Sequence, residues 1–285
     1  MTMMDGARTR SRVLRSAIQP GYGRQVWLVI GLVAGYVATS VAGSMAFRFV
    51  GIPRFDLAIG LVLPYAMLFG GVGVLATVGG TIVGDVLNGT IGVTTLVGGA
   101  AHLFAGFVCY RLADRSWDGQ FRSTRSMLSI IAIGLFTAAA AGAMTGWGYE
   151  VLGIAPFYLA GPLTISYLLA FGGIGVPALI GGLRYQYQSI ESGRAVSRTA
   201  WMVGATLLGW LVIGLIASVS YYNLARIPAW ALTDIGVGML PGLITHPIIG
   251  PGAVHVQSFL AAVAIGTTMV LLTASRSTTA RHTWS

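Results

Sequence analysis

The stretch that decides the fold covers residues 54–88 and reads RFDLAIGLVLPYAMLFGGVGVLATVGGTIVGDVLN. It is apolar, rich in glycine, and interrupted by the glycine cluster of residues 69–73. Such a cluster lets two helices pack closely, or lets the chain turn between them. Asp56 stands near its start and Asp85 near its end. The apolar runs on either side of the cluster therefore predict a helical hairpin within a bilayer. Charges at membrane depth usually face a cavity or a partner, and we expect the same of these aspartates.

The composition of the whole chain agrees with a membrane protein. Of its 285 residues 55% are hydrophobic and only 9% are charged, against about 25% charged in soluble domains. The mean hydropathy is +0.78. Several runs approach the roughly 20 apolar residues that span a bilayer, and they are continuous rather than alternating. We therefore predict an all-α polytopic protein of the cell membrane.

The basic residues indicate orientation rather than a nucleic-acid partner. All 17 are arginines, and they give a net charge of +9. They cluster between the apolar runs, as the positive-inside rule describes, so we predict no nucleic acid among the partners and place both termini in the cytoplasm. The single cysteine, Cys109, excludes a disulfide within the chain and a cysteine metal cluster.

The apolar runs divide the chain into eight predicted spans. A basic cytoplasmic tail (1–25) precedes a six-helix core (26–190), and two further helices with an outer Pro/Gly-rich segment (223–255) make up residues 191–285. With this assignment every arginine-rich loop falls on one side. The second and third spans are short, so we expect them to be tilted or partly re-entrant. The predicted spans are 26–47, 57–68, 72–87, 91–111, 127–148, 156–183, 201–222 and 256–275.

A glycine-rich phrase occurs twice. Residues 69–80 (FGGVGVLATVGG) correspond to residues 171–182 (FGGIGVPALIGG). A duplicated half is one interpretation, since many transporters contain repeats. The charge pattern places the first copy across a turn and the second inside one span, which favours two similar packing faces instead.

Small residues follow one side of the first span. Ala34, Ala38 and Ala42 recur at a spacing of four, which makes a flat stripe on one helix face where another helix can approach closely. The stripe predicts packing either inside this molecule or against a partner subunit.

Three polar residues of adjacent spans are the main candidates for ligand binding. Asp85 and Asn88 share one helix face because they are three residues apart, and His102 lies near the middle of the next span. Together a carboxylate, an amide and an imidazole suit a small polar ligand in an outer cavity. Each taken alone is also explained by a helix cap or a hydrogen bond between helices. The ligand hypothesis depends on Asp85 lining a wet pocket.

A second group of candidates lies near the outer end of the fifth span. Glu150 and Tyr158 follow or flank Trp147 and Tyr149. These side chains could form an outer gate or stacking surface for ligand, or anchor the chain at the membrane interface.

No recognised catalytic or cofactor motif is present. His246 and His255 are nine residues apart, which is not a known metal-ligand spacing, and no Walker, dinucleotide, HExxH or GxSxG motif occurs. We therefore predict no metal, no cofactor and no enzymatic activity, and any ATP-driven step would need another chain.

Residues 26–190 resemble the substrate-binding S component of energy-coupling factor (ECF) transporters. The resemblance lies in the alanine-spaced first helix, the glycine-punctuated pair (LPYAMLFGGVGVLATVGGTIVGDVLNG) and the long sixth helix. It implies a six-helix core that binds a vitamin-like ligand near its outer face. It also implies that the alanine helix docks on a T component, with an ATPase subunit as energy source. Residues 200–285 would add two helices to that family's six.

Two functions are therefore expected, in order of preference. The first is an uptake subunit that captures a small metabolite or vitamin. The second is a membrane-embedded sensory or interaction protein without enzymatic activity, because glycine-rich sensor domains of the MASE1 type look similar over the same stretch. A membrane enzyme using His102 or the segment with His246 and His255 is a third possibility, for which clustered carboxylates or metal ligands are missing.

Overall fold

The computed structural model describes residues 22–49, 56–116, 124–183, 197–224 and 249–274. These residues form eight α-helices and one short 3₁₀ helix, and no strand occurs among them, which confirms the all-α prediction. The elements are α2 (Tyr22–Phe49), η1 (Leu57–Leu61), α3 (Val62–Phe69), α4 (Gly71–Leu87), α5 (Val93–Ser116), α6 (Thr124–Val151), α7 (Phe157–Leu183), α8 (Arg198–Leu224) and α11 (Ile249–Ala274).

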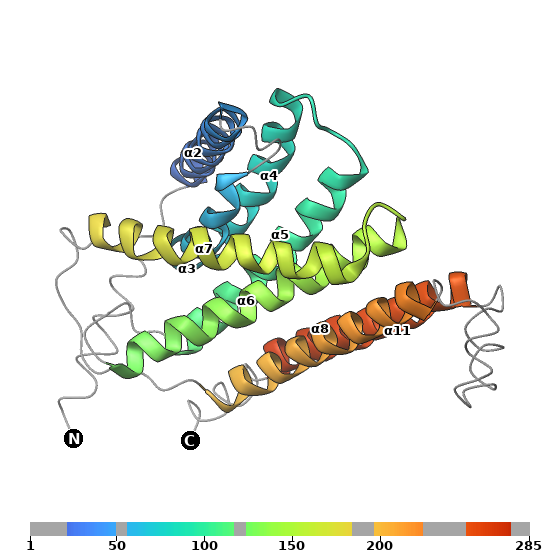
Figure 1. The fold of residues 1–285 in the computed structure, drawn as a ribbon. Coiled ribbons are helices and arrows are strands. Elements are labelled where there is room, and N and C mark those ends of the chain that lie inside the picture. The colour runs from blue at the N-terminus through green and yellow to red at the C-terminus, as the bar shows by residue number, and fades with distance from the viewer. Residues whose placement is uncertain (1–21, 50–55, 117–123, 184–196, 225–248, 275–285) are drawn as a thin grey trace, which may run out of the picture.

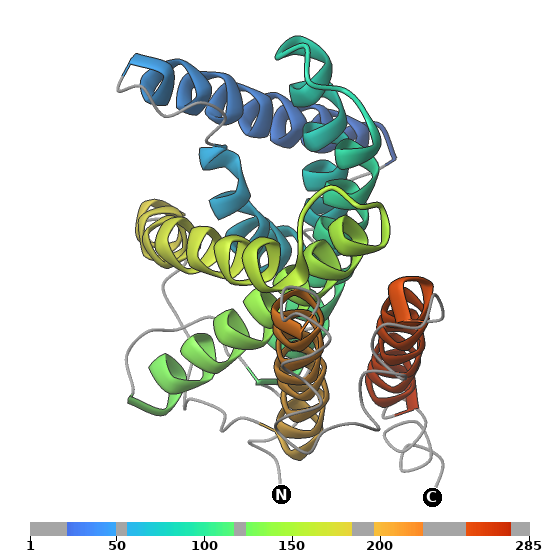
Figure 2. The same ribbon diagram turned by 45° about the vertical axis from the view of Figure 1, so that its right-hand side comes forward.

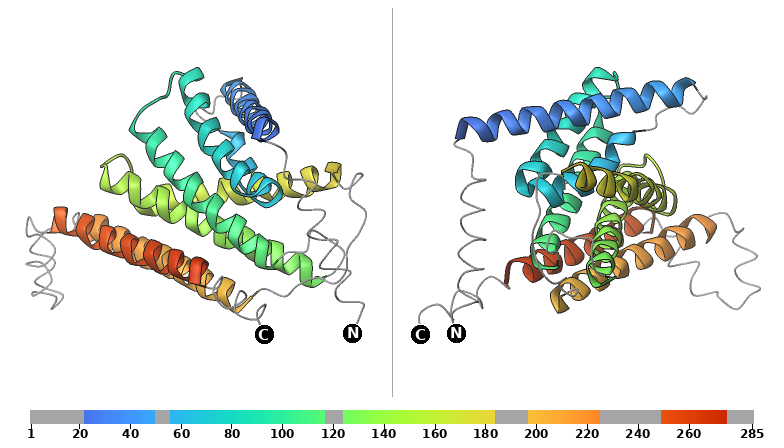
Figure 3. Two further views of the ribbon diagram at one scale, coloured as in Figure 1. Left: turned by 180° about the vertical axis from the view of Figure 1, so that it is seen from behind. Right: turned by 90° about the vertical axis from the view of Figure 1, so that its left-hand side faces the viewer.

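Helix α6 is the centre of the molecule. It packs against α5, α7, α8 and α11 (Figure 1). Helix α2 packs on α4 and η1 at one end of the molecule, and α8 and α11 lie side by side at the other (Figures 1 and 3). Figure 2 shows the same order of helices from a second direction. The main hydrophobic core takes most of its residues from α5, α6 and α8, with others from α3, α4, α7 and α11, and a smaller core lies between α2 and the η1–α3–α4 segment.

Four helical segments are long and apolar enough to cross a membrane. They are Val26–Met45, Val93–Ala113, Met127–Val151 and Arg198–Val219. Four other apolar helical segments among the described residues are shorter: Leu57–Phe69, Gly71–Leu87, Phe157–Gly172 and Gln257–Thr273. Length and composition thus agree with a membrane protein. The six-plus-two count of spans and the cytoplasmic termini remain predictions.

The expected hairpin is built around one glycine. Gly70 separates α3 from α4 with a φ of 59°, a backbone conformation that favours glycine. One turn further on, a Cβ atom at Gly73 would collide with the backbone carbonyl of Tyr65. The helices therefore cross where no side chain intervenes, and the prediction of a glycine-dependent turn is confirmed.

The two copies of the glycine-rich phrase adopt different structures. Phe69 ends α3 before the turn, whereas residues 171–182 lie within the continuous helix α7, as the charge pattern predicts. Most of the first copy lies in α4, whereas the start of the second copy packs on η1, where a Cβ atom at Gly60 would lie 2.5 Å from the Cβ of Phe171. Whether the two copies arose by duplication stays a prediction.

Two helices extend well beyond their predicted spans. Helix α5 continues to Ser116, five residues past the predicted end at Arg111. The side chain of Arg111 is buried, and its guanidinium donates a hydrogen bond to the carbonyl of Leu272 on α11 (2.5 Å) and lies 5.7 Å from the centre of the Phe107 ring. Helix α11 begins at Ile249 rather than at residue 256. Most of the predicted basic tail, residues 1–21, lies outside the described residues, as does His246.

Candidate functional site

A buried polar cluster joins three helices near the α2 end of the molecule. Its members are Tyr36 on α2, Thr81 on α4 and His102 on α5, hereafter the Tyr36–Thr81–His102 cluster. The hydroxyl of Thr81 lies 2.8 Å from His102 Nδ1 and 3.2 Å from the hydroxyl of Tyr36, which is 3.4 Å from the same nitrogen. All three side chains are buried. The predicted ligand residue His102 thus has two hydroxyl partners that belong to other helices.

A glycine makes this cluster possible. A Cβ atom at Gly80 would lie 2.6 Å from the ring of Tyr36, which is fully buried. Because Gly80 has no side chain, the tyrosine ring rests directly on α4 and its hydroxyl reaches Thr81 one residue further on. Close approach of this kind is the usual role of small residues between membrane helices.

Asp85 holds the connection between α4 and α5. One carboxylate oxygen accepts a hydrogen bond from Thr90 (3.2 Å) and the other from Thr95 in the first turn of α5 (2.6 Å). The Thr95 hydroxyl oxygen also accepts from the backbone N–H of Gly92 (3.1 Å). This arrangement ties one helix to its neighbour, and it occupies both oxygens of the carboxylate.

The three predicted ligand residues do not form one hydrogen-bonded group. Asn88 is the C-cap of α4, where its backbone N–H donates to Gly84 (2.9 Å). Among the described residues no hydrogen bond links His102 to Asp85 or Asn88. His102 belongs to the buried cluster, whereas Asp85 and Asn88 belong to the connection that follows α4.

Glu150 forms a second buried polar cluster, between α6, α8 and α11. Its carboxylate accepts hydrogen bonds from the Ser218 hydroxyl (2.9 Å) and the Gln257 amide (3.2 Å). The same amide donates to the carbonyl of Gly214 (3.1 Å), and the backbone N–H of Phe157 also donates to Glu150. We call Glu150, Ser218 and Gln257 the Glu150 clamp. Within the described part of the chain no cation forms an ion pair with this carboxylate, and Gln257 Oε1 lacks a partner.

The residues around Glu150 are only partly those that the sequence indicated. Tyr158 is half-buried in the first turn of α7. Trp147 donates to Ser258 on α11 (3.4 Å). Sequence reasoning missed Ser218 and Gln257. Their only signal is that each is a polar residue in an otherwise apolar helix.

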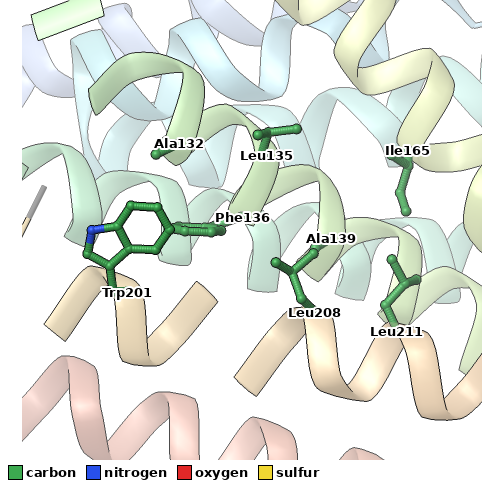
Figure 4. Close-up of a pocket in the computed structure, with 8 residues that line it drawn as sticks. All are labelled: Ala132, Leu135, Phe136, Ala139, Ile165, Trp201, Leu208 and Leu211. Carbon is green, nitrogen blue, oxygen red and sulfur yellow. The ribbon is translucent and has the colours of Figure 1, made fainter. Parts of the chain in front are cut away.

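An apolar groove opens between α6 and α8, with α7 at one side (Figure 4). Its volume is about 240 Å³. The ring of Phe136 meets that of Trp201 edge to face, with centroids 5.6 Å apart. Small alanines on α6 leave the space that the larger side chains of α8 enclose. The lining residues are Ala132, Leu135, Phe136, Ala139, Ile165, Trp201, Leu208 and Leu211.

The alanine stripe of α2 faces away from the rest of the described molecule. Ala34, Ala38 and Ala42 are all exposed, while Tyr36 and Ser40 on the opposite side are buried. Packing of the stripe inside this molecule was one expectation, and it is wrong for the described residues. Docking against a partner stays a prediction.

These features define a helical protein with apolar helices of membrane-spanning length and polar side chains paired between helices. Within the described residues, no group of three or more His, Cys, Asp or Glu side chains could hold a metal ion. Comparison of the chain with models of protein families, with curated proteins and with solved structures yields no match.

Proposed function

We propose that this chain is the integral membrane subunit of an uptake system for a small metabolite or vitamin in the cell membrane, energised by a separate ATPase module. The observation that carries the proposal is the two-sided character of α2. One face offers small side chains to the outside, and the other is bonded to the buried polar cluster.

The outer face of α2 suits a second helix. Ala34, Ala38 and Ala42 are exposed, and larger exposed side chains stand at either end of the stripe, Trp27 (73% exposed) and Met45 (68% exposed). A row of methyl groups between bulkier neighbours forms a shallow recess that a partner helix can enter closely. Docking of a T component on this helix is what the resemblance to S components implies.

The inner face of α2 gives such docking a consequence. Tyr36 projects from the buried side of α2 and touches Thr81 and His102 on two other helices. A partner that tilts or shifts α2 must therefore change the hydrogen bonds of the Tyr36–Thr81–His102 cluster. Two hydroxyl groups and an imidazole can exchange these bonds for bonds to a polar ligand. Ligand binding and partner docking would in this way be coupled through one helix.

Asp85 can bind a ligand only by giving up a hydrogen bond within the connection between α4 and α5. Both of its carboxylate oxygens accept from threonines there. A ligand donor near Asp85 and Asn88 would have to replace Thr90 or Thr95, which would loosen the start of α5. On this proposal the connection between α4 and α5 opens when ligand enters. Glu150 and Tyr158 would then lie across the ligand site from Asp85, at the same outer end.

Co-purification from membranes tests the partner. The tagged full chain should bring down an ATPase and a second membrane subunit, and mass spectrometry of the purified sample should detect a retained small molecule. Ala38→Leu fills the recess on α2 and should release the partners. Ala262→Leu changes another exposed alanine, on α11, and should keep them. Neither partner nor ligand with the unmodified chain would refute the proposal.

An interaction or sensory protein is the second candidate. It is favoured by the occupied carboxylate of Asp85, which needs no ligand to be satisfied. The same α2 recess would then bind a signalling partner. A signalling protein in the co-purified sample, with partner binding sensitive to Ala38→Leu and no retained small molecule, would favour this function over uptake.

A further inference from the structure

We infer that the apolar groove between α6 and α8 holds one acyl chain of an anionic phospholipid, with the lipid phosphate next to Arg198. This inference does not depend on the uptake function. It rests on three observations: the groove lies on helices of membrane-spanning length, its own length matches one leaflet, and Arg198 stands near one end.

The groove opens on helices that have membrane-spanning length. Met127–Val151 and Arg198–Val219 both meet that criterion, and they supply most of the lining. Among the lining side chains, Trp201 is 58% exposed, Leu135 45% and Leu208 42%. Water gains little in a cavity without polar partners. A hydrocarbon chain is the apolar filler that surrounds these helices in a bilayer, and it recovers the packing contacts that an empty groove would lose.

The length of the groove matches one leaflet. On α8 the lining runs from Trp201 to Leu211, a distance of roughly 15 Å at the rise of an α-helix. The hydrocarbon core of a bilayer is about 30 Å thick. A lipid whose glycerol lies near Trp201 would therefore extend its chain along the groove to about the middle of the membrane. A tryptophan at this end of the groove agrees with the proposed position of the glycerol, since indole rings favour the interface.

The phosphate position follows from the helical spacing. Arg198 precedes Trp201 by three residues, so both lie on the same face of α8. Arg198 is exposed and is the first residue of α8. The positive end of the helix dipole adds to the arginine charge at this point. The arginine pattern of the sequence places this end of α8 at the cytoplasmic leaflet, where anionic lipids attract basic residues.

Native mass spectrometry of the full chain in mild detergent tests the inference with two probes, dioleoyl phosphatidylglycerol and dioleoyl phosphatidylcholine. The unmodified chain should retain one lipid molecule and prefer phosphatidylglycerol. Leu208→Trp fills the groove and should abolish retention. Leu163→Trp makes the same change at an exposed position of α7 outside the groove and should have no effect. Arg198→Gln should weaken phosphatidylglycerol binding about fivefold and leave phosphatidylcholine unchanged.

Retention by Leu208→Trp equal to that of the unmodified chain would overturn the inference, as would a chain that retains neither probe. A polypeptide that covers the groove and excludes both lipids would also overturn it. If Leu208→Trp does not fold, the lipid preference of Arg198→Gln decides. Loss of the preference for phosphatidylglycerol supports the inference, and an unchanged preference refutes it.

Discussion

The α2–α4 and α6–α8 interfaces of this molecule both depend on small residues, with different results. At the α2 end, Gly80 lies under the ring of Tyr36, so α2 and α4 meet without a gap. Between α6 and α8, a Cβ atom at Gly204 would likewise collide with the ring of Phe136, yet a groove remains beside that contact, lined by Ala132 and Ala139 among others. Glycine thus lets both pairs of helices meet closely, but only the α6–α8 interface leaves an apolar groove next to the contact.

The buried polar groups differ in a related way. The Tyr36–Thr81–His102 cluster consists of neutral groups that bond to one another between close helices. The Glu150 clamp has a carboxylate at its centre, and it joins α6 to α8 and α11. We expect the Glu150 clamp to hold α8 and α11 against α6, which we call the grooved side, because the groove leaves apolar packing there incomplete. The following predictions test this contrast.

Loss of the Glu150 clamp should lower the stability of the protein more than any other change considered below. Glu150→Ala removes the acceptor of the Ser218 hydroxyl and one of the two acceptors of the Gln257 amide, which should lower the free energy of unfolding by about 3 kcal/mol. The melting temperature in detergent measures this. Glu150→Gln keeps an acceptor oxygen and should lose less. Equal melting temperatures for Glu150→Ala and the unmodified chain would show that the grooved side is stable without the clamp.

A methyl group under Tyr36 should have the next largest effect. Gly80→Ala places a Cβ atom 2.6 Å from the tyrosine ring, and such overpacking costs roughly 1–3 kcal/mol. The neighbouring Gly79→Ala is the control, because its Cβ atom would meet only Val33 at an ordinary 3.4 Å. Thermal unfolding of both variants should separate them. Equal stability would mean that α2 is not tightly packed on α4.

Removal of one hydroxyl from the polar cluster should have a smaller effect. Thr81→Val loses the bonds to His102 and Tyr36 while keeping the shape of the side chain. Interhelical hydrogen bonds in membranes contribute about 0.6 kcal/mol on average, and a loss near this value is expected. In Thr164→Val the lost hydroxyl bonds only to Ala160 within its own helix, so stability should hardly change. The two melting temperatures give the comparison.

The smallest expected effect is a dependence on pH at the start of η1. Asp56 accepts from the backbone of Ala58 and from Ser40 on α2, and burial raises the pKa of this carboxyl above 3.8. The folded state then holds the proton more tightly than the unfolded state does. The associated stability is complete below pH 3.8 and is lost as the pH rises through the folded-state pKa.

The melting temperature should accordingly fall slightly as the pH rises above 3.8. Asp56→Asn keeps a good N-cap residue and removes the titration, so its melting temperature should follow pH less steeply. The same pH dependence in both proteins would assign it to another group.

The positions of the helices could be predicted from the sequence. Long apolar runs separated by arginine-rich loops identify each helix, and the glycine cluster of residues 69–73 identifies the turn at Gly70. These are local signals, since they depend on residues next to one another in the chain. The direction in which Ala34, Ala38 and Ala42 face could not be predicted, because α2 is apolar on both sides.

The partners of the polar residues could not be predicted either. Glu150 bonds to residues 68 and 107 positions away, and His102 bonds to one 66 positions away. Nothing in an apolar helix distinguishes a serine that meets a carboxylate from one that bonds to its own backbone. Asp85 was expected to line a pocket, whereas both of its carboxylate oxygens accept hydrogen bonds from threonines within ten residues. Its role in ligand binding stays a prediction.

The bond from Arg111 to Leu272 has a consequence for biosynthesis. It joins residues 161 positions apart, and it supplies an acceptor for a guanidinium buried in α5. While the ribosome is still making the second half of the chain, that positive charge lacks this acceptor. Helix α11 therefore completes an arrangement begun at α5, and a chain cut short before α11 should be selectively degraded by membrane proteases.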